Sequence, residues 1–167
     1  PLLPPGRTKV VSGSSVTFET PLRYAHWGVM QSVSGVTLDE RAEVGLLTRT
    51  IVIQGDSASL TGGIGGHVMV MQGATAHVEG VTFTRMGQKA RLARYPMHWH
   101  LLSHADGKFT GDATGHVIRN SAIWQSANRC IVIHATNGVE VRNNICHDIA
   151  GHAYFLEDAV ERRNVLE

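Results

Sequence analysis

Histidine is the residue type in this sequence whose number and spacing are best suited to chemistry. The chain holds ten histidines among 167 residues, and seven of them lie between residues 98 and 152. His98 and His100 stand two apart in an apolar run, so on a strand both side chains point to one face, about 6.6 Å apart. Two imidazoles so placed can bind one metal ion, at roughly 2.0–2.1 Å from each nitrogen.

A repeat indicates how distant histidines come together. Residues 118–124 align with residues 141–147 at an offset of 23 (141 − 118 = 23), and the same offset aligns 130–134 with 153–157. Residues 160–164 read against 139–143 with an offset of 21 (160 − 139 = 21). An earlier unit at 78–83 carries Gly80 where Asn120 and Asn143 stand in the later ones. A period of this length, built from short strands, is typical of a β-solenoid.

The pattern of short β-branched runs predicts an all-β fold. Helical periodicity is scarce, and runs of three to six apolar residues are bounded by Gly, Asn, Asp or Ser. Coils stacked about 4.8 Å apart would bury a continuous apolar column, with asparagines accepting the left-handed backbone of the turns. A sandwich or jelly roll also uses many short strands, but it does not require one offset to hold for two different strands.

The repeat divides the chain into two parts. Residues 1–40 lack it and read as an N-terminal β segment that caps or precedes the first coil, and residues 41–167 form the solenoid. Residues 87–93 and 103–114 interrupt the period, so we expect loops projecting from the wall. Because Glu167 falls inside the pattern, further chain or a partner is expected to cover the open end.

The register predicts the composition of a metal site. His134 ends the equivalent strand of the coil after that of His98 and His100, and Glu157 falls at the same place one coil later (157 − 134 = 23). Three histidines with an acid suit zinc, copper, nickel or iron better than calcium or magnesium. Glu157 or Asp158 would then be a fourth ligand or a general base.

Other residues are assigned to the same patch by register or by type. His152 shares the register of Arg129 (152 − 129 = 23), so both are candidates to line it, with His152 handling protons. Tyr95 and Trp99 are candidate sugar-stacking residues, and His147, in the register of Trp124, is a candidate for stacking or hydrogen bonding.

The adjacent carboxylates and the cysteines argue against two other kinds of site. Glu157 and Asp158 would face opposite sides of a strand, which disfavours a glycosidase built from these two alone. Cys130 could act as a nucleophile beside His134, but its apolar strand favours buried packing. Two cysteines, Cys130 and Cys146, do not make the disulfide framework of a small secreted domain.

Composition excludes several classes of protein. With 15 basic and 14 acidic residues and a net charge of +1, the chain lacks the basic excess of a nucleic-acid binder held by bulk charge. No apolar run approaches the ~18 residues of a membrane span. A disordered tail is excluded because apolar residues make up 43%. Any export signal is expected to lie outside this sequence.

Several motifs together resemble one family. The segments that carry the likeness are 41–49, 65–71, 85–88, 94–100, 128–134 and 151–158. In this order they resemble the β-helix region shared by the cell migration-inducing hyaluronan-binding protein, the transmembrane cell-surface hyaluronidase and the fibrocystin-like proteins. The resemblance implies a right-handed parallel β-helix, preceded by the end of a glycine-rich β domain. It also implies a secreted or cell-surface protein that acts on, or binds, a glycosaminoglycan-like polysaccharide.

Three functional hypotheses follow. The first is metal-dependent cleavage of an acidic polysaccharide, by hydrolysis or lysis, at the histidine site. The second is a non-catalytic carbohydrate-binding or adhesion module in which the histidines are structural. The third is metal-dependent chemistry on a small molecule.

Overall fold

The computed structural model describes residues 8–22 and 24–167, and the chain divides into two compact units between Gly45 and Leu46. The sequence placed this boundary at residue 40. The first unit contains two antiparallel hairpins, formed by β1 (Thr8–Ser12) with β2 (Ser15–Phe18) and by β3 (Gln31–Val33) with β4 (Val36–Leu38). Ser34 and Gly35 both have positive φ, as a two-residue turn between twisted strands requires. That the first unit caps the solenoid stays a prediction.

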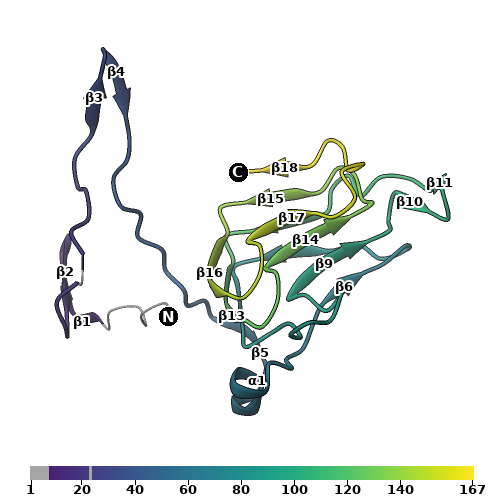
Figure 1. Ribbon diagram of the computed structural model, residues 1–167, viewed down its shortest axis with the longest axis horizontal. Coiled ribbons are helices and arrows are strands. Elements are labelled where there is room, and N and C mark those ends of the chain that lie inside the picture. Colours follow the sequence, from purple (N-terminus) through teal and green to yellow (C-terminus); the bar gives the residue numbers. More distant parts are fainter. Residues whose placement is uncertain (1–7, 23) are drawn as a thin grey trace. The chain divides into compact units, whose positions relative to one another are not determined.

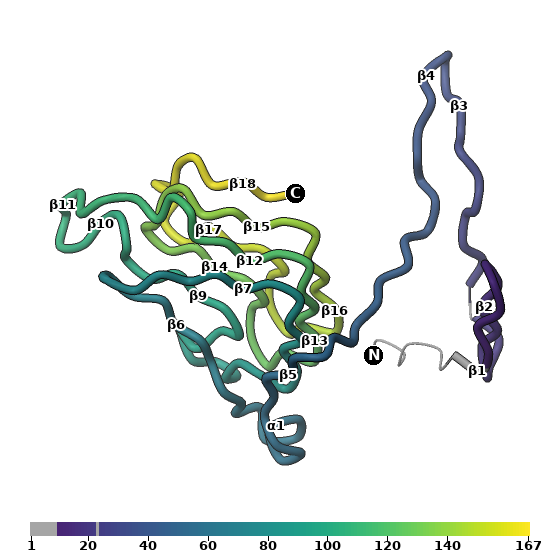
Figure 2. The backbone as a smooth tube through the Cα atoms, turned by 180° about the vertical axis from the view of Figure 1, so that it is seen from behind, coloured from purple at the N-terminus to yellow at the C-terminus, as the bar shows by residue number. Residues whose placement is uncertain are grey.

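The second unit is a parallel β-helix with three four-stranded sheets (Figures 1 and 2). The first sheet is ordered β16 (Ile145–Ile149), β13 (Ala122–Ser126), β8 (Val81–Thr84), β5 (Ile51–Gln54). The second is ordered β17 (Tyr154–Leu156), β14 (Ile131–His134), β9 (Met97–His100), β6 (Met69–Val70). The third is ordered β18 (Val165–Leu166), β15 (Glu140–Arg142), β12 (Val117–Arg119), β7 (His77–Glu79). Each coil adds one strand to each sheet, so the predicted solenoid is confirmed.

The 23-residue offset holds for one strand pair in each of the three sheets. Ala122 pairs with Ile145, Ile131 with Tyr154, and Val117 with Glu140. The turn residues Gly80, Asn120 and Asn143 all have positive φ, so glycine and asparagine stand at equivalent left-handed corners as expected.

The predicted offset of 21 for the last segment is wrong. Glu140 pairs with Val165, an offset of 25 (165 − 140 = 25). The connection between β17 and β18 is longer than the match assumed, and Asn164 consequently lies opposite Val139, whose N–H its Oδ1 accepts.

The interior of the solenoid is apolar and follows strand alternation. Phe83, Ile123, Trp99 and Ile133 are buried members of the core, and the residues directly beside them in each strand lie outside this apolar cluster. Stacking these positions coil upon coil supplies the main apolar burial of the unit.

Both predicted interruptions are present as insertions between strands. Residues 87–93 form an irregular loop between β8 and β9. Residues 103–114 contain a small hairpin of β10 (His104–Ala105) and β11 (Lys108–Phe109). One short helix, α1 (Ser57–Gly62), begins after Asp56, which accepts the Ser59 N–H as an N-cap. Among the described residues, no helix has the length and apolarity needed to cross a membrane.

Candidate metal centre

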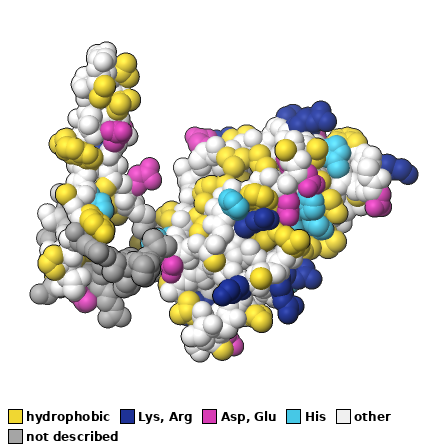
Figure 3. Space-filling view, in the orientation of Figure 1, with side chains coloured by type: hydrophobic (Ala, Val, Ile, Leu, Met, Phe, Trp, Pro, Cys, Tyr) yellow, Lys and Arg dark blue, Asp and Glu magenta, His cyan; other side chains and the backbone are white. Residues whose placement is uncertain are grey.

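His98, His100 and His134 come together on the outer face of the second sheet. β9 and β14 pair in parallel with His100 opposite His134, and their Nδ1 atoms lie 2.9 Å apart. The His98 ring lies 4.9 Å from that of His100 and is nearly parallel to that of His134, at 6.1 Å. One nitrogen from each of the three rings lies within 4.8 Å of the others. Figure 3 shows histidine surface over the ends of β9 and β14, beside acidic and basic side chains.

Burial disfavours the charged form of two of these imidazoles. His98 is fully buried, and this burial lowers its pKa from 6.5 to about 3. Burial, followed by the neighbouring His134, also lowers the pKa of His100. Neutral imidazole is the form that binds transition metals.

Five buried side-chain polar atoms have no hydrogen-bond partner among the described residues, and two of them approach each other at the cluster. These two are His98 Nε2 and Glu157 Oε2, which lie 3.9 Å apart. His98 Nδ1 lies 3.2 Å from the Ala93 carbonyl. Because that carbonyl can only accept, Nδ1 carries the proton and Nε2 presents a free lone pair. Glu157 Oε2 is also 3.9 Å from His134 Nδ1, so both unpartnered atoms lie at the imidazole cluster.

The two adjacent carboxylates both reach His134. Asp158 Oδ2 lies 2.9 Å from His134 Nε2, the nitrogen on the other side of the ring from Glu157. The prediction that Glu157 and Asp158 face opposite sides of a strand is therefore wrong. β17 ends at Leu156, so strand alternation does not apply to them.

Arg129 and Tyr95 hold the second oxygen of Glu157. Arg129 Nη1 donates to Glu157 Oε1 at 3.3 Å and to the Tyr95 hydroxyl at 2.8 Å, and that hydroxyl donates to Oε1 at 3.4 Å. The guanidinium packs 3.8 Å above the Phe155 ring, whose other neighbour is the His152 ring at 4.8 Å. Arg129 and His152 thus share one patch, as the register predicted, but His152 touches the stack and not the three-histidine cluster.

The structure corrects the sugar-stacking assignments of Tyr95 and Trp99. Trp99 points into the core, fully buried, and its Nε1 donates to His116 Nδ1. Tyr95 is 1% exposed, with its hydroxyl engaged by Arg129. Neither ring face is open to a ligand.

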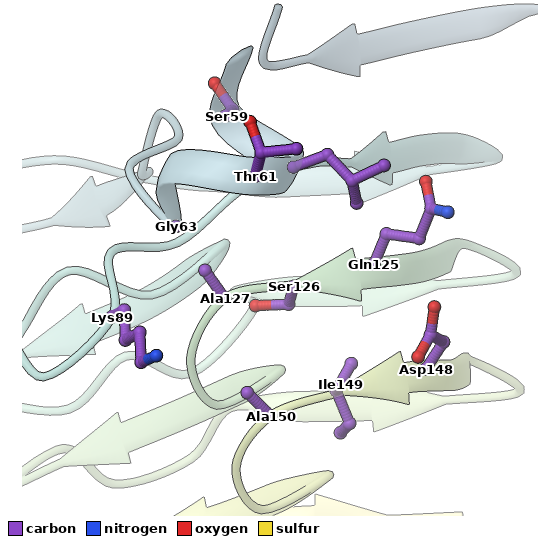
Figure 4. A pocket seen from close by; sticks show the side chains of 11 residues that line it. Ser59, Thr61, Gly63, Lys89, Gln125, Ser126, Ala127, Asp148, Ile149 and Ala150 are labelled. Carbon is purple, nitrogen blue, oxygen red and sulfur yellow. The ribbon is translucent and has the colours of Figure 1, made fainter. Parts of the chain in front are cut away.

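His147 lies away from the cluster. It is on β16 in the first sheet, opposite Trp124 as the register predicted, and half-buried. A hollow of about 330 Å³ on this side of the solenoid is lined by Lys89, Gln125 and Asp148 among others (Figure 4). None of its lining residues is a predicted site residue.

The two cysteines form a disulfide bond, which the sequence reading did not predict. Cys130, directly before β14, is joined to Cys146 on β16, so the bond links the coil of His134 to the next one. Cys130 is therefore no free nucleophile, although it is buried as expected. Disulfides persist in oxidising compartments.

The sequence analysis also missed residues that hydrogen-bond to the site residues or to their backbone. The Ala93 carbonyl orients His98, and Glu161 accepts the backbone N–H groups of Ala135 and Asp158. No side-chain motif marks a carbonyl. Glu161 lies beyond the last strand whose register the repeat predicted correctly.

Comparison with known proteins agrees with this architecture. The profile described as the CEMIP β-helix matches residues 63–167, which is more than half of the chain. The chain belongs to the CEMIP β-helix family. The family match includes β9, β14 and β17, the strands at which the candidate centre is built.

Individual relatives extend the similarity over almost the whole sequence. A G8 domain-containing protein of Dictyostelium discoideum is 36% identical over 93% of this chain and 12% of its own length. Human cell surface hyaluronidase CEMIP2 is 40% identical over 89% of this chain and 11% of its own. Mouse fibrocystin-L is 34% identical over 93% and 4%. The chain therefore spans a small part of each of these relatives.

Proposed function

We propose that the chain binds a divalent transition-metal ion, zinc foremost, through His98, His100 and His134. The observation that carries this proposal is the pair of buried unpartnered atoms, His98 Nε2 and Glu157 Oε2, beside two further imidazoles. A buried polar atom without a partner costs free energy, and a cation bound between these two would satisfy both. Imidazole nitrogens with one carboxylate suit zinc, copper, nickel or iron, whereas calcium and magnesium prefer oxygen ligands.

The surroundings of the histidines support a metal site. In such sites the second ring nitrogen of a ligating histidine donates to a carbonyl or carboxylate, which fixes the ring and its tautomer. Here Ala93 O takes that place for His98, and Asp158 takes it for His134. Glu157 is the fourth ligand or the base of the site.

The centre cleaves a glycosaminoglycan-like polysaccharide at the cell surface or outside the cell. The relative named as a cell surface hyaluronidase supports both the substrate class and the location. The disulfide supports an oxidising compartment. The bound metal would supply a Lewis acid that polarises a substrate oxygen.

The chain's own residues have separate roles in this proposal. Arg129 and Tyr95 hold Glu157 Oε1, which leaves Oε2 turned toward the cluster, where it can exchange a proton with a substrate or water. His152, whose exposed ring packs 4.8 Å from that of Phe155, contacts substrate at the rim in this proposal.

Elemental analysis and polymer sizing of the purified chain test the proposal. We expect one equivalent of transition metal per chain, lost in the His98→Ala, His134→Ala double variant and kept in a His147→Ala control. Hyaluronan should be shortened by the wild type and the control, but not by the double variant or by chelated protein. Circular dichroism shows whether the double variant is folded, and the single variant His100→Ala repeats the test if it is not.

Each other outcome overturns a defined part of the proposal. Metal-free wild-type protein overturns the metal site, and if it still binds hyaluronan the chain is a non-catalytic carbohydrate-binding module. Stoichiometric metal without any binding or cleavage of polysaccharide overturns the substrate class in favour of metal-dependent chemistry on a small molecule.

A further inference from the structure

Glu161 connects the two backbone segments that present His134 and its partner Asp158. It lies between β17 and β18, and its Oε1 accepts the N–H of Ala135 at 2.8 Å and that of Asp158 at 3.0 Å. Ala135 directly follows His134, and the side chain of Asp158 meets the His134 ring. One carboxylate oxygen therefore joins the backbone on both sides of this contact.

The Glu161 carboxylate accepts a hydrogen bond that, at the equivalent position of the preceding coil, a backbone carbonyl accepts. There, Leu101, the residue after His100, donates its N–H to the carbonyl of His134. One coil later the same position is Ala135, and it donates to Glu161 Oε1 instead of to a carbonyl. Leu101 and Ala135 both have positive φ, so the two corners have the same backbone form and differ in their acceptor.

Because Glu161 replaces the carbonyl acceptor, the chain can end its pairing with β14 at Leu156. β17 ends at Leu156, and the following residues turn so that both Glu157 and Asp158 face His134. Ala135 is only 3% exposed, so its N–H would lack an acceptor if nothing replaced the missing carbonyl. Glu161 supplies the acceptor with a charge, which makes the bonds stronger than neutral ones.

We infer that Glu161 is a positioning residue of the centre: its carboxylate ends the β14–β17 ladder and holds Asp158 against His134 Nε2. That contact keeps the proton on Nε2 and leaves the lone pair of Nδ1 directed toward His98, His100 and Glu157. The effect on metal affinity rests on the proposed function, whereas the effect on the backbone and on the His134 tautomer does not.

The test compares Glu161→Ala and Glu161→Gln with wild type in the whole chain. An amide oxygen can accept both N–H groups, so Glu161→Gln should stay close to wild type, with bonds weakened only by the loss of charge, while Glu161→Ala loses both bonds. Glu140→Ala is the matched control, because Glu140 is an exposed carboxylate on β15 that accepts a hydrogen bond from the side chain of Arg142.

Two measurements on metal-free protein decide the positioning role. Amide hydrogen exchange at Ala135 and Asp158 should be about tenfold faster or more in Glu161→Ala. The ¹⁵N shifts of the His134 ring should show a single Nε2–H tautomer in wild type and Glu161→Gln, and a mixture in Glu161→Ala. Unchanged exchange and tautomer in Glu161→Ala overturn the inference, as does a Glu161→Gln variant that fails to rescue them.

A third measurement, zinc affinity by chelator competition, separates this inference from the proposed function. Glu161→Ala should bind zinc about 10–100-fold more weakly than wild type, as substitutions behind metal ligands do, with Glu161→Gln near wild type. If the wild type binds no zinc, the proposed function fails while exchange and tautomer still decide the role of Glu161. If Glu161→Ala does not fold, Glu161→Asp, whose carboxylate is one methylene shorter, must show the same defects in weaker form, and its behaving as wild type overturns the inference.

Discussion

Two kinds of polar cluster bridge successive coils of this β-helix, and they differ in whether their polar atoms are satisfied. The asparagines are satisfied: Asn144 accepts the Ser121 N–H and donates to Ile118 O, and Asn164 accepts the Val139 N–H and donates to Thr136 O. The histidine cluster uses the same stacking but leaves His98 Nε2 without a partner in the described part of the chain.

The difference separates structure from function within one scaffold. An asparagine that caps the free backbone groups of the next coil stabilises the stack and leaves nothing for a ligand. A buried nitrogen lone pair beside a buried carboxylate oxygen destabilises the empty site, and such a cost is retained in proteins where a ligand offsets it. Substitutions in the two clusters should therefore affect different measurements.

The largest expected effect is on metal affinity, from His100→Ala. This removes one of three imidazoles, so zinc affinity should fall by more than the roughly 10–100-fold that substitution of a ligand's hydrogen-bond partner causes. Because His100 is only half-buried and its Nδ1 pairs with the His134 ring, the unfolding free energy of metal-free protein should change little. Chelator competition and urea unfolding measure the two quantities, and His77→Ala on β7 is the control.

A smaller effect on affinity is expected from Asp158→Ala. Loss of the carboxylate at His134 Nε2 should weaken zinc binding about 10–100-fold, because the ring is no longer held in one tautomer. Glu79→Ala removes an exposed carboxylate of the third sheet and should leave zinc affinity unchanged. Equal affinities for Asp158→Ala and wild type would show that Asp158 is merely a surface neighbour of the ring.

Asn164→Ala is expected to lower stability and to leave metal affinity unchanged. Its loss leaves the buried Val139 N–H without an acceptor, which should lower the unfolding free energy by about 1–3 kcal/mol, with zinc affinity unchanged. Asn164→Asp keeps an acceptor for the Val139 N–H, so its unfolding free energy should lie between those of wild type and Asn164→Ala. A variant that loses metal and stability together would contradict the division of the polar clusters into two kinds.

The sequence predicts the solenoid and the meeting of the three histidines for the same reason. Parallel stacking places equivalent positions of successive coils side by side, whatever the loops between them add. Ile118 and Val141 pair at the offset of 23, whereas His100 and His134 pair at an offset of 34 (134 − 100 = 34), because the insertion at residues 103–114 lies between them. Strand alternation applied strictly would also have excluded Trp99 from any ligand site, since it stands between His98 and His100 and must face the interior.

The features that the sequence does not predict are those that the strand repeat does not determine. Whether Glu157 and Asp158 face apart or together depends on the end of β17 at Leu156, which no residue type marks. The Cys130–Cys146 disulfide joins residues 16 apart, outside the 23-residue register, so the repeat could not pair them. Tyr95 is buried through its contacts with the side chains of Arg129 and Glu157, which alternation along one strand does not reveal.

The smallest expected effect tests the buried histidine through pH. Burial lowers the pKa of His98 to about 3, against 6.5 in the unfolded chain, so between these values the unfolded state binds more protons. Its contribution to stability is therefore lost progressively as the pH falls from 6.5 to about 3. Between pH 7 and pH 6 this one group should lower the unfolding free energy of metal-free protein by up to about 1 kcal/mol.

The variant His98→Asn isolates this contribution. Asparagine carries an N–H close to the position of His98 Nδ1, which can still donate to the Ala93 carbonyl, but it does not titrate. The groups that face His98, namely His100, His134, Arg129 and Glu157, are present in both proteins, so their titration cancels in the difference. Urea unfolding at pH 7 and pH 6 in the presence of chelator gives that difference. Equal pH slopes would mean that His98 is protonated as readily in the folded chain as in the unfolded one, which a dry, unpartnered Nε2 does not allow.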